Sequence, residues 1–120
     1  ILLVEDEPAI LKMAEAMLNK LGYKTISAQT PAQAEYLVKK HSGQIDLLIT
    51  DVVMPEMNGK ELAQRIFVHF PKIKRLFMSG YPADIIADHG IVGAGVSFIK
   101  KPFTIQKLSE KIREVIENNE

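Results

Sequence analysis

Five short apolar segments alternate with segments of helical periodicity along the chain, and this alternation constrains the fold more than any other feature. Strict alternation of strand and helix predicts a parallel sheet with right-handed crossovers and helices on both faces. The segments that we expect to be strands are Ile1–Val4, Lys24–Ala28, Ile45–Thr50, Arg75–Ser79 and Val96–Lys100.

Helices are expected between these strands because apolar residues recur there at helical spacing. Proline follows Glu7 and Thr30, where it suits the first helical turn, and Gly22 lies where a C-terminal cap belongs. We expect five helices. The first begins at Pro8, the second at Thr30-Pro31, and the third runs through Leu62 to Phe70. The fourth covers the weaker pattern Pro82–Gly90, and the fifth runs through Ile105 to Ile116, with Thr104 as its cap.

The polarity of the segments predicts which strand lies at an edge of the sheet. The second segment, KTISA, alternates polar and apolar residues and is expected at an edge, whereas the other four are nearly all apolar, as strands covered on both faces must be. For the complete order we adopt 2-1-3-4-5, the order known for flavodoxin-like folds, in which the first and third segments lie side by side and the second lies outside the first. We therefore predict an α/β fold of flavodoxin-like type: a (βα)5 three-layer sandwich around a parallel five-stranded sheet.

Acidic residues end two of the central strands. Glu5 and Asp6 follow the first segment and Asp51 follows the third, so this order brings three carboxylates to one edge of the sheet. At separations of about 4–5 Å and an effective dielectric near 20, ionised carboxylates repel by roughly 3–4 kcal/mol per pair. Either the carboxylates are protonated or cations lie among them, and oxygen ligands at such a site suit Mg²⁺. Lys101 lies just past the end of the fifth segment and Ser79 ends the fourth, so they add an ammonium and a hydroxyl at the same edge.

Composition limits the class of protein. The chain has 120 residues, 47% of them hydrophobic, which predicts one compact domain with its own core over 1–120. Its 15 basic and 15 acidic residues balance, so we expect neither nucleic acid nor membrane to be bound by this domain. The absence of cysteine fits a reducing, cytoplasmic location. Because the chain opens inside the apolar run ILLV without an initiator Met, we expect it to be one domain of a longer protein.

Four motifs carry a family resemblance: LLVEDE, DVVMPEMNG, FMSGY and FIKKPF, in this order and spacing. Together they strongly resemble the response-regulator receiver domain of two-component signalling, over essentially the whole chain. The resemblance implies a phospho-accepting signalling switch, not an enzyme beyond its own phosphorylation and dephosphorylation. It implies Mg²⁺ as cofactor, and as partner a histidine kinase or a histidine phosphotransfer domain. A kinase or output domain elsewhere in the same chain is a further implied partner.

The resemblance also implies a role for individual residues. Asp51 is the expected phospho-acceptor, with Lys101 and Ser79 contacting the phosphoryl group. Glu5, Asp6, Asp51 and the backbone carbonyl of Val53 are the expected metal ligands. Ser79 and Phe98 are the expected switch pair. A cis peptide bond is expected at Lys101–Pro102.

Two details of the sequence qualify the resemblance. Glu5 stands where the family more often has Asp, and its extra methylene also permits a contact with the metal through water. The sequence SGYP after the fourth segment is more similar to receivers of hybrid sensor kinases than to those of transcription factors.

Each site residue also has a plainer interpretation when it is taken alone. Asp6 or Glu7 can cap the first helix, Asp51 can cap a turn, and Ser79 can be a turn hydroxyl. By the same reasoning Phe98 would be a core residue and Lys101 a surface lysine. These interpretations leave unexplained why all the groups end strands at one edge of the sheet.

Three other functions each predict a different set of residues. A phosphatase of the haloacid-dehalogenase type needs a second acid two residues after the first, and that position holds Val53. A receiver-like module that binds partners without phosphorylation would be expected to lack the acceptor, an acidic partner or the lysine, and this chain keeps them. A flavin carrier of similar topology needs a phosphate-binding loop after the first strand, where EDEP is acidic and repels phosphate.

Overall fold

The structure is a computed structural model that describes residues 1–54, 56–80 and 97–117. Its centre is a parallel sheet of five strands in the order β2-β1-β3-β4-β5, as the sequence predicted. The strands are β1 (Leu2–Val4), β2 (Ile26–Ala28), β3 (Leu47–Asp51), β4 (Lys74–Ser79) and β5 (Phe98–Lys100). The alternating segment β2 lies at one edge, which confirms its prediction as an edge strand.

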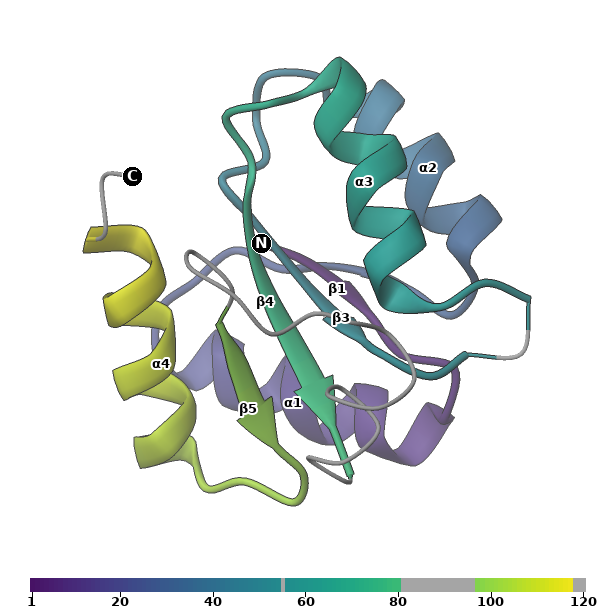
Figure 1. Ribbon diagram of the computed structural model, residues 1–120. Coiled ribbons are helices and arrows are strands. Elements are labelled where there is room, and N and C mark those ends of the chain that lie inside the picture. Colours follow the sequence, from purple (N-terminus) through teal and green to yellow (C-terminus); the bar gives the residue numbers. More distant parts are fainter. Residues whose placement is uncertain (55, 81–96, 118–120) are drawn as a thin grey trace.

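Helices cover both faces of the sheet, which makes the three-layer flavodoxin-like architecture (Figure 1). In Figure 1, α2 and α3 lie on one face, and α1 and α4 lie on the other. Their bounds are α1 (Pro8–Lys20), α2 (Pro31–Lys40), α3 (Gly59–His69) and α4 (Ile105–Glu117). The helix that we expected over Pro82–Gly90 lies outside the described residues, as does Val96 at the start of the fifth expected strand.

Local sequence signals explain where the helices begin. Proline is the first residue of α1 and of α2, and the Thr30 hydroxyl accepts a hydrogen bond from the Gln33 N–H at 3.1 Å. The predicted cap Thr104 is confirmed, because its hydroxyl accepts from the Lys107 N–H at 3.1 Å. These capping contacts stabilise the first turns of α2 and α4.

Two apolar cores hold the layers together. One lies under α2 and α3 and the other under α1 and α4, and the alternation of side chains along β3 divides its residues between them. Leu48 faces the first core, and Leu47 and Ile49 face the second. Because every residue of β3 is buried, Asp51 at its end is carried into a largely dry environment.

Candidate phospho-acceptor and metal site

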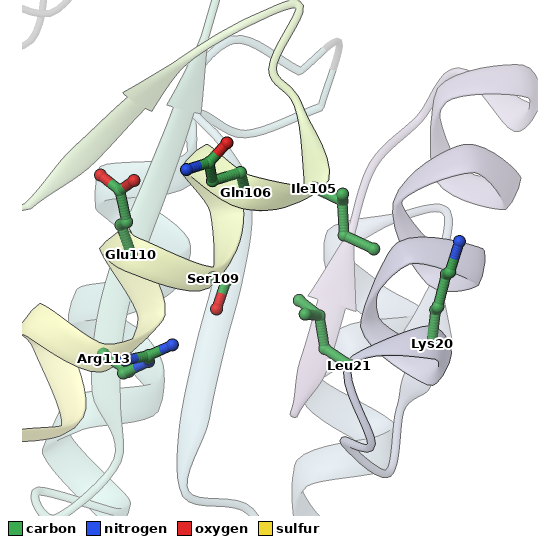
Figure 2. Close-up of a pocket in the computed structure, with 7 residues that line it drawn as sticks. All are labelled: Lys20, Leu21, Ile105, Gln106, Ser109, Glu110 and Arg113. Carbon is green, nitrogen blue, oxygen red and sulfur yellow. The ribbon is translucent and has the colours of Figure 1, made fainter.

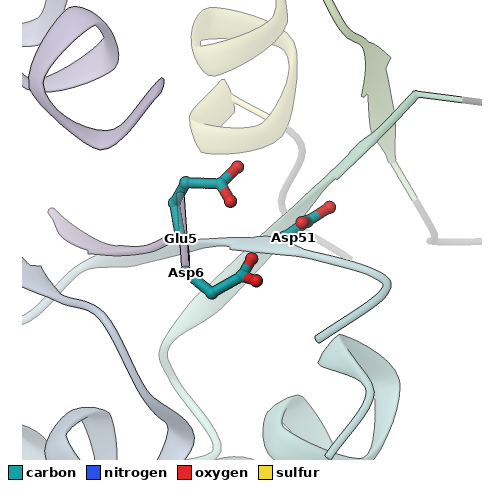
Figure 3. A group of neighbouring side chains, drawn as sticks. All are labelled: Glu5, Asp6 and Asp51. Atoms are coloured by element: carbon teal, nitrogen blue, oxygen red, sulfur yellow. The ribbon is translucent and has the colours of Figure 1, made fainter. Parts of the chain in front are cut away.

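Three carboxylates meet at the carboxyl ends of β1 and β3. Glu5 and Asp6 directly follow β1, and Asp51 is the last residue of β3. Each offers a carboxylate oxygen, and these ligand atoms all lie within 4.8 Å of one another. Figure 3 shows Glu5 and Asp6 reaching from the end of β1 toward Asp51. The structure thus brings together the acidic residues that the sequence predicted to converge.

Lys101 joins two of these acids. Its ammonium nitrogen Nζ lies 3.0 Å from Oε1 of Glu5 and 3.2 Å from Oδ1 of Asp51. The lysine follows β5, and its own N–H donates to the Ser79 carbonyl oxygen at 2.7 Å. The residue directly after the edge strand β5 therefore places its ammonium in contact with acids at the ends of β1 and β3.

Burial determines the protonation behaviour of the acids. Glu5 is fully buried and Asp51 is 7% exposed. Burial raises the pKa of Asp51 above its usual range, and the nearby Lys101 ammonium offsets part of this rise. Burial likewise raises the pKa of Glu5, although the Glu7 N–H and Lys101 oppose it. Both carboxyl groups therefore hold a proton more tightly than they would in water, and additional positive charge at the site would favour their ionised forms.

Lys101 shows the opposite balance. Burial lowers its pKa, but the contacts with Glu5 and Asp51 together outweigh burial and raise the pKa of the lysine above its ordinary value. Lys101 is therefore firmly ammonium at neutral pH. One ammonium among three carboxylates still leaves negative charge in excess.

The other predicted site residues differ in exposure and in their position on the sheet. Ser79 is the last residue of β4 and is 3% exposed, and the sheet pairs it with Lys100 on β5. Val53 is 52% exposed, just beyond the end of β3. Phe98 is 37% exposed and pairs with Phe77 in the sheet, so the interpretation of Phe98 as an ordinary core residue is not supported. The cis peptide bond predicted at Lys101–Pro102 is present.

The interpretation of Asp6 or Glu7 as the side-chain cap of α1 does not fit the structure. The N-terminal capping position of α1 is Glu7, whose side chain makes no capping hydrogen bond. The Glu7 N–H instead donates to Oε2 of Glu5 at 3.1 Å. The backbone at the start of α1 therefore helps to fix the carboxylate of Glu5.

Sequence reasoning missed the tight contact between β3 and the start of α3. A Cβ atom added at Gly59 would lie 2.1 Å from the backbone carbonyl oxygen of Asp51, so a side chain cannot fit there without movement of the backbone. Asn58 caps α3 by accepting from the Glu61 N–H at 2.7 Å. The Asn-Gly pair itself was the available signal, since Asn is a favoured cap and Gly allows close approach.

A surface pocket of about 460 Å³ lies apart from the acidic cluster, between the end of α1 and α4 (Figure 2). In Figure 2, Leu21 and Ile105 face each other across it, and charged side chains lie around them. Neither the three clustered acids nor Lys101 line this pocket. The acidic cluster and its lysine therefore lie outside this pocket.

The comparison with known families agrees with this geometry. The model of the response regulator receiver domain matches residues 1–113. The chain belongs to the response regulator receiver domain family. Receiver domains are phospho-accepting signalling switches of two-component systems that interact with histidine kinases or phosphotransfer proteins. The resemblance to receiver domains that the four sequence motifs indicated is therefore confirmed.

Individual relatives point the same way. Sensor kinase CckA of Brucella abortus (strain 2308) is 33% identical over 120 residues, a match that covers 100% of this chain and 13% of the kinase. The chain is also similar to the crystal structure of the receiver domain from hybrid histidine kinase CckA, with a TM-score of 0.81 and 31% identity, over 97% of both chains. The response regulator protein TrrA from Thermotoga maritima, solved in complex with Mg(2+)-BeF, gives a TM-score of 0.77 at 28% identity over 95% of this chain and 96% of that one.

The acidic cluster is suited to the metal that the family implies. Receiver domains bind Mg²⁺ at an acidic pocket, and Mg²⁺ prefers carboxylate, carbonyl and water oxygens. The three clustered acids offer such oxygens within a short distance, with negative charge in excess. Two of them have pKa values raised by burial, which a bound divalent cation would oppose. The donor set therefore fits a hard divalent cation.

Among the described residues, no helix combines the length and the apolar character that crossing a membrane requires.

Proposed function

We propose that this chain is a switch in which Asp51 accepts a phosphoryl group, with Mg²⁺ bound at Asp6, Asp51 and the Val53 carbonyl, and with Glu5 beside the metal. The proposed donor is the phosphohistidine of a histidine kinase or of a histidine phosphotransfer domain, in the cytoplasm. The observation that carries this proposal is the contact of the Lys101 ammonium with Asp51 at 3.2 Å, beside two further acids, in a chain of the receiver family.

The reaction needs a nucleophile that is held in place and relieved of repulsion. An oxygen of the Asp51 carboxylate attacks phosphorus, the bond from phosphorus to the donor nitrogen breaks, and the imidazole leaves with its electron pair. Bound Mg²⁺ supplies positive charge that offsets the negative charge of Asp51 and of the incoming group. Lys101 adds its own positive charge at a phosphoryl oxygen, because its nitrogen is already within contact distance of Asp51.

The switch proposed here follows from new hydrogen bonds to the phosphoryl group. Ser79 directly follows Met78, the sheet partner of Asp51, so its hydroxyl can turn toward a group on Asp51, and Phe98 then repacks. A change from 1:99 to 99:1 between two states needs about 5.5 kcal/mol. Each charge-assisted hydrogen bond contributes roughly 1.5–3 kcal/mol. Two or three such bonds from Lys101 and Ser79 are therefore sufficient.

We also propose that this domain is part of a longer protein. The chain spans only 13% of the length of the sensor kinase that it matches. We place residues 1–120 as one receiver domain within a longer signalling protein, with a kinase or output region elsewhere in that chain. This domain itself is proposed to bind neither nucleic acid nor membrane.

The acceptor is tested with a small phosphodonor. We expect acetyl phosphate with Mg²⁺ to place one acid-labile phosphoryl group on the wild-type domain, detected by intact mass, and the Asp51→Asn variant to take none. The control is Asp46→Asn, which removes an exposed acid that directly precedes β3 and should leave labelling unchanged. Persistent labelling of Asp51→Asn would place the acceptor elsewhere.

A further inference from the structure

The pocket between the end of α1 and α4 combines a small apolar centre with unpaired charges (Figure 2). Leu21 and Ile105, both half-buried, face each other across it. Lys20, Glu110 and Arg113 also line the pocket, and all three are exposed. Within the described part of the chain, none of these three charged side chains forms an ion pair. The pocket therefore presents apolar surface together with charges of both signs.

A second apolar side chain lies on the same side of α4, beyond the pocket. Intervals of three or four residues place four side chains on one stripe of this helix: Ile105, Ser109, Arg113 and Ile116. Ile116 is 39% exposed, and its carbonyl oxygen accepts a hydrogen bond from the Lys74 ammonium at 3.0 Å. The last turn of α4 is thus attached to β4, and it carries an exposed apolar side chain in a fixed place.

We propose that two copies of this chain associate through this stripe, with their α4 helices antiparallel, so that Ile116 of each copy enters the pocket of the other. Ile105 and Ile116 lie about 16 Å apart along the helix axis, at about 1.5 Å per residue. A two-fold axis midway between them brings Ile116 of each copy opposite Ile105 of the other. One symmetric contact therefore fills both pockets.

The charges favour a second copy as the occupant of the pocket. In the antiparallel arrangement, Arg113 of one copy and Glu110 of the other are offset by only about 3 Å along the helix axis, within reach of an arginine side chain. The two-fold axis makes this ion pair form twice. A partner with a purely acidic or purely basic face would instead place like charges opposite each other at one of these residues. The face is thus complementary to itself.

The contact is expected to be weak and separate from the acceptor site. α4 has 13 residues, and a contact of this extent belongs with the small interfaces that dissociate readily. Neither the acidic cluster nor Lys101 lines the pocket. Association therefore uses residues other than those that we propose for phosphorylation.

A mixture of two charge-reversed variants tests the contact directly. Arg113→Glu places an acid opposite Glu110 of an identical copy, and Glu110→Arg places a cation opposite Arg113, so each variant should associate poorly with itself. In a mixture of the two variants, each new charge meets an opposite charge on the other copy. Recovery in the mixture identifies a contact between copies, because an effect within one chain would persist there.

Sedimentation velocity measures the association from about 10 µM to about 1 mM, the range in which weak interfaces dissociate. We expect the wild type to move from monomer toward dimer over this range. Since the two-fold axis makes each substitution act twice, we expect either charge reversal to raise Kd by about tenfold or more. The equimolar mixture should return Kd to within about threefold of the wild type. Urea unfolding of each variant verifies that it folds.

Lys107→Glu and Glu114→Lys are the matched controls. They reverse exposed charges of α4 that do not line the pocket, and they change the net charge as the two test variants do. We expect each control variant to associate as the wild type does and their mixture to show no gain. An equal gain in the control mixture would attribute association to net charge and overturn the proposal.

The apolar part of the contact is tested separately. Ile116→Ser removes the side chain that enters the pocket, and we expect it to raise Kd by about fivefold or more, because the loss occurs twice in the dimer. Val68→Ser is the control: it removes an apolar side chain of α3 that is 74% exposed, and Kd should not change.

Two further results would overturn the proposal. A wild-type chain that remains monomeric over the whole concentration series has no such contact. A dimer that neither Arg113→Glu nor Ile116→Ser weakens associates through another surface.

Discussion

At the scale of the residue, the site is a set of charges placed where water is largely excluded. Asp51 and Glu5 are buried at the ends of strands, and Lys101 lies within 3.2 Å of each. Burial raises the pKa of both acids, which means that the folded chain holds protons on them more tightly than the unfolded chain does. Ionised acids buried in this way lower the free energy of unfolding, and the same burial makes the site able to bind positive charge and a phosphoryl group.

The first prediction concerns the stability of Asp51→Asn without divalent ions. A raised pKa in the folded state gives stability that is fully present below the unfolded value, near 3.8 for Asp51, and is lost as the pH rises through the folded value. At pH 7 the wild type therefore carries the unfavourable charge that the variant lacks. We expect Asp51→Asn to be more stable at pH 7 by about 1–2 kcal/mol in urea unfolding with EDTA present.

The difference between the two proteins should shrink as the pH is lowered toward 4. Glu110→Gln, which removes an exposed acid on α4, serves as the control and should show no comparable gain. A variant that is less stable than the wild type at pH 7 would contradict this account of Asp51.

At the scale of the element, the site depends on how closely α3 approaches the end of β3. The Gly59 N–H donates to the Val52 carbonyl oxygen at 2.7 Å, and the Asn58 side chain caps the first turn of α3. The carbonyl oxygen of Asp51 lies directly against Gly59, where a Cβ would be 2.1 Å away. The backbone around the acceptor is therefore held by the start of a helix as well as by the sheet.

The second prediction is that Gly59→Ala destabilises the domain, because backbone atoms of Asp51 must move to make room for the methyl group. We expect a loss of about 2–4 kcal/mol in urea unfolding, together with slower phosphorylation by acetyl phosphate. Gly80→Ala is the matched control: a Cβ there meets no atom of the described residues within 4 Å, and a change within about 0.5 kcal/mol is expected. Equal effects of the two substitutions would rule out the close approach at Gly59 as their cause.

At the scale of the whole molecule, the parallel sheet collects groups from remote parts of the sequence. The strand order places β1 and β3 side by side and continues through β4 to β5, so residues 5, 51, 79 and 101 come to one edge. The same order buries two apolar cores, one under each pair of helices (Figure 1). Folding and assembly of the site are therefore one event, and a ligand of the site should stabilise the whole domain.

The third prediction follows from this linkage. If Mg²⁺ binds the folded domain and not the unfolded chain, a concentration of 100 times Kd adds about 2.7 kcal/mol to the free energy of unfolding. We expect this increase for the wild type, a much smaller one for Asp6→Asn, and the full increase for the Asp46→Asn control. Urea unfolding with EDTA and with MgCl₂ measures it, and equal stabilisation of Asp6→Asn would exclude Asp6 as a ligand.

The sequence alone determined the alternation of strands and helices and the position of the edge strand, because periodicity and polarity are local properties of the chain; the full strand order was adopted from known folds. Nearly continuous apolar segments indicated buried parallel strands, and the alternation in KTISA indicated the edge strand β2, which the structure confirms. The beginnings of α1, α2 and α4 followed from Pro8, Pro31 and Thr104. The ends of the strands were less certain: β3 begins at Leu47, two residues later than expected, and includes Asp51, because hydrogen bonds to β4 set its limits.

The acidic residues and the lysine were also identified from the sequence, since polar groups that end apolar strands have to meet at the carboxyl edge of a parallel sheet. The sequence did not show which acid pairs with the lysine, nor that a methyl group at Gly59 would collide with the acceptor's carbonyl. Distances of 3.0 Å between Lys101 and Glu5, or 2.1 Å at Gly59, arise from the angles at which strands and helices pack. Those angles are set by the two cores together, so only the tertiary structure decides which charge each carboxylate faces.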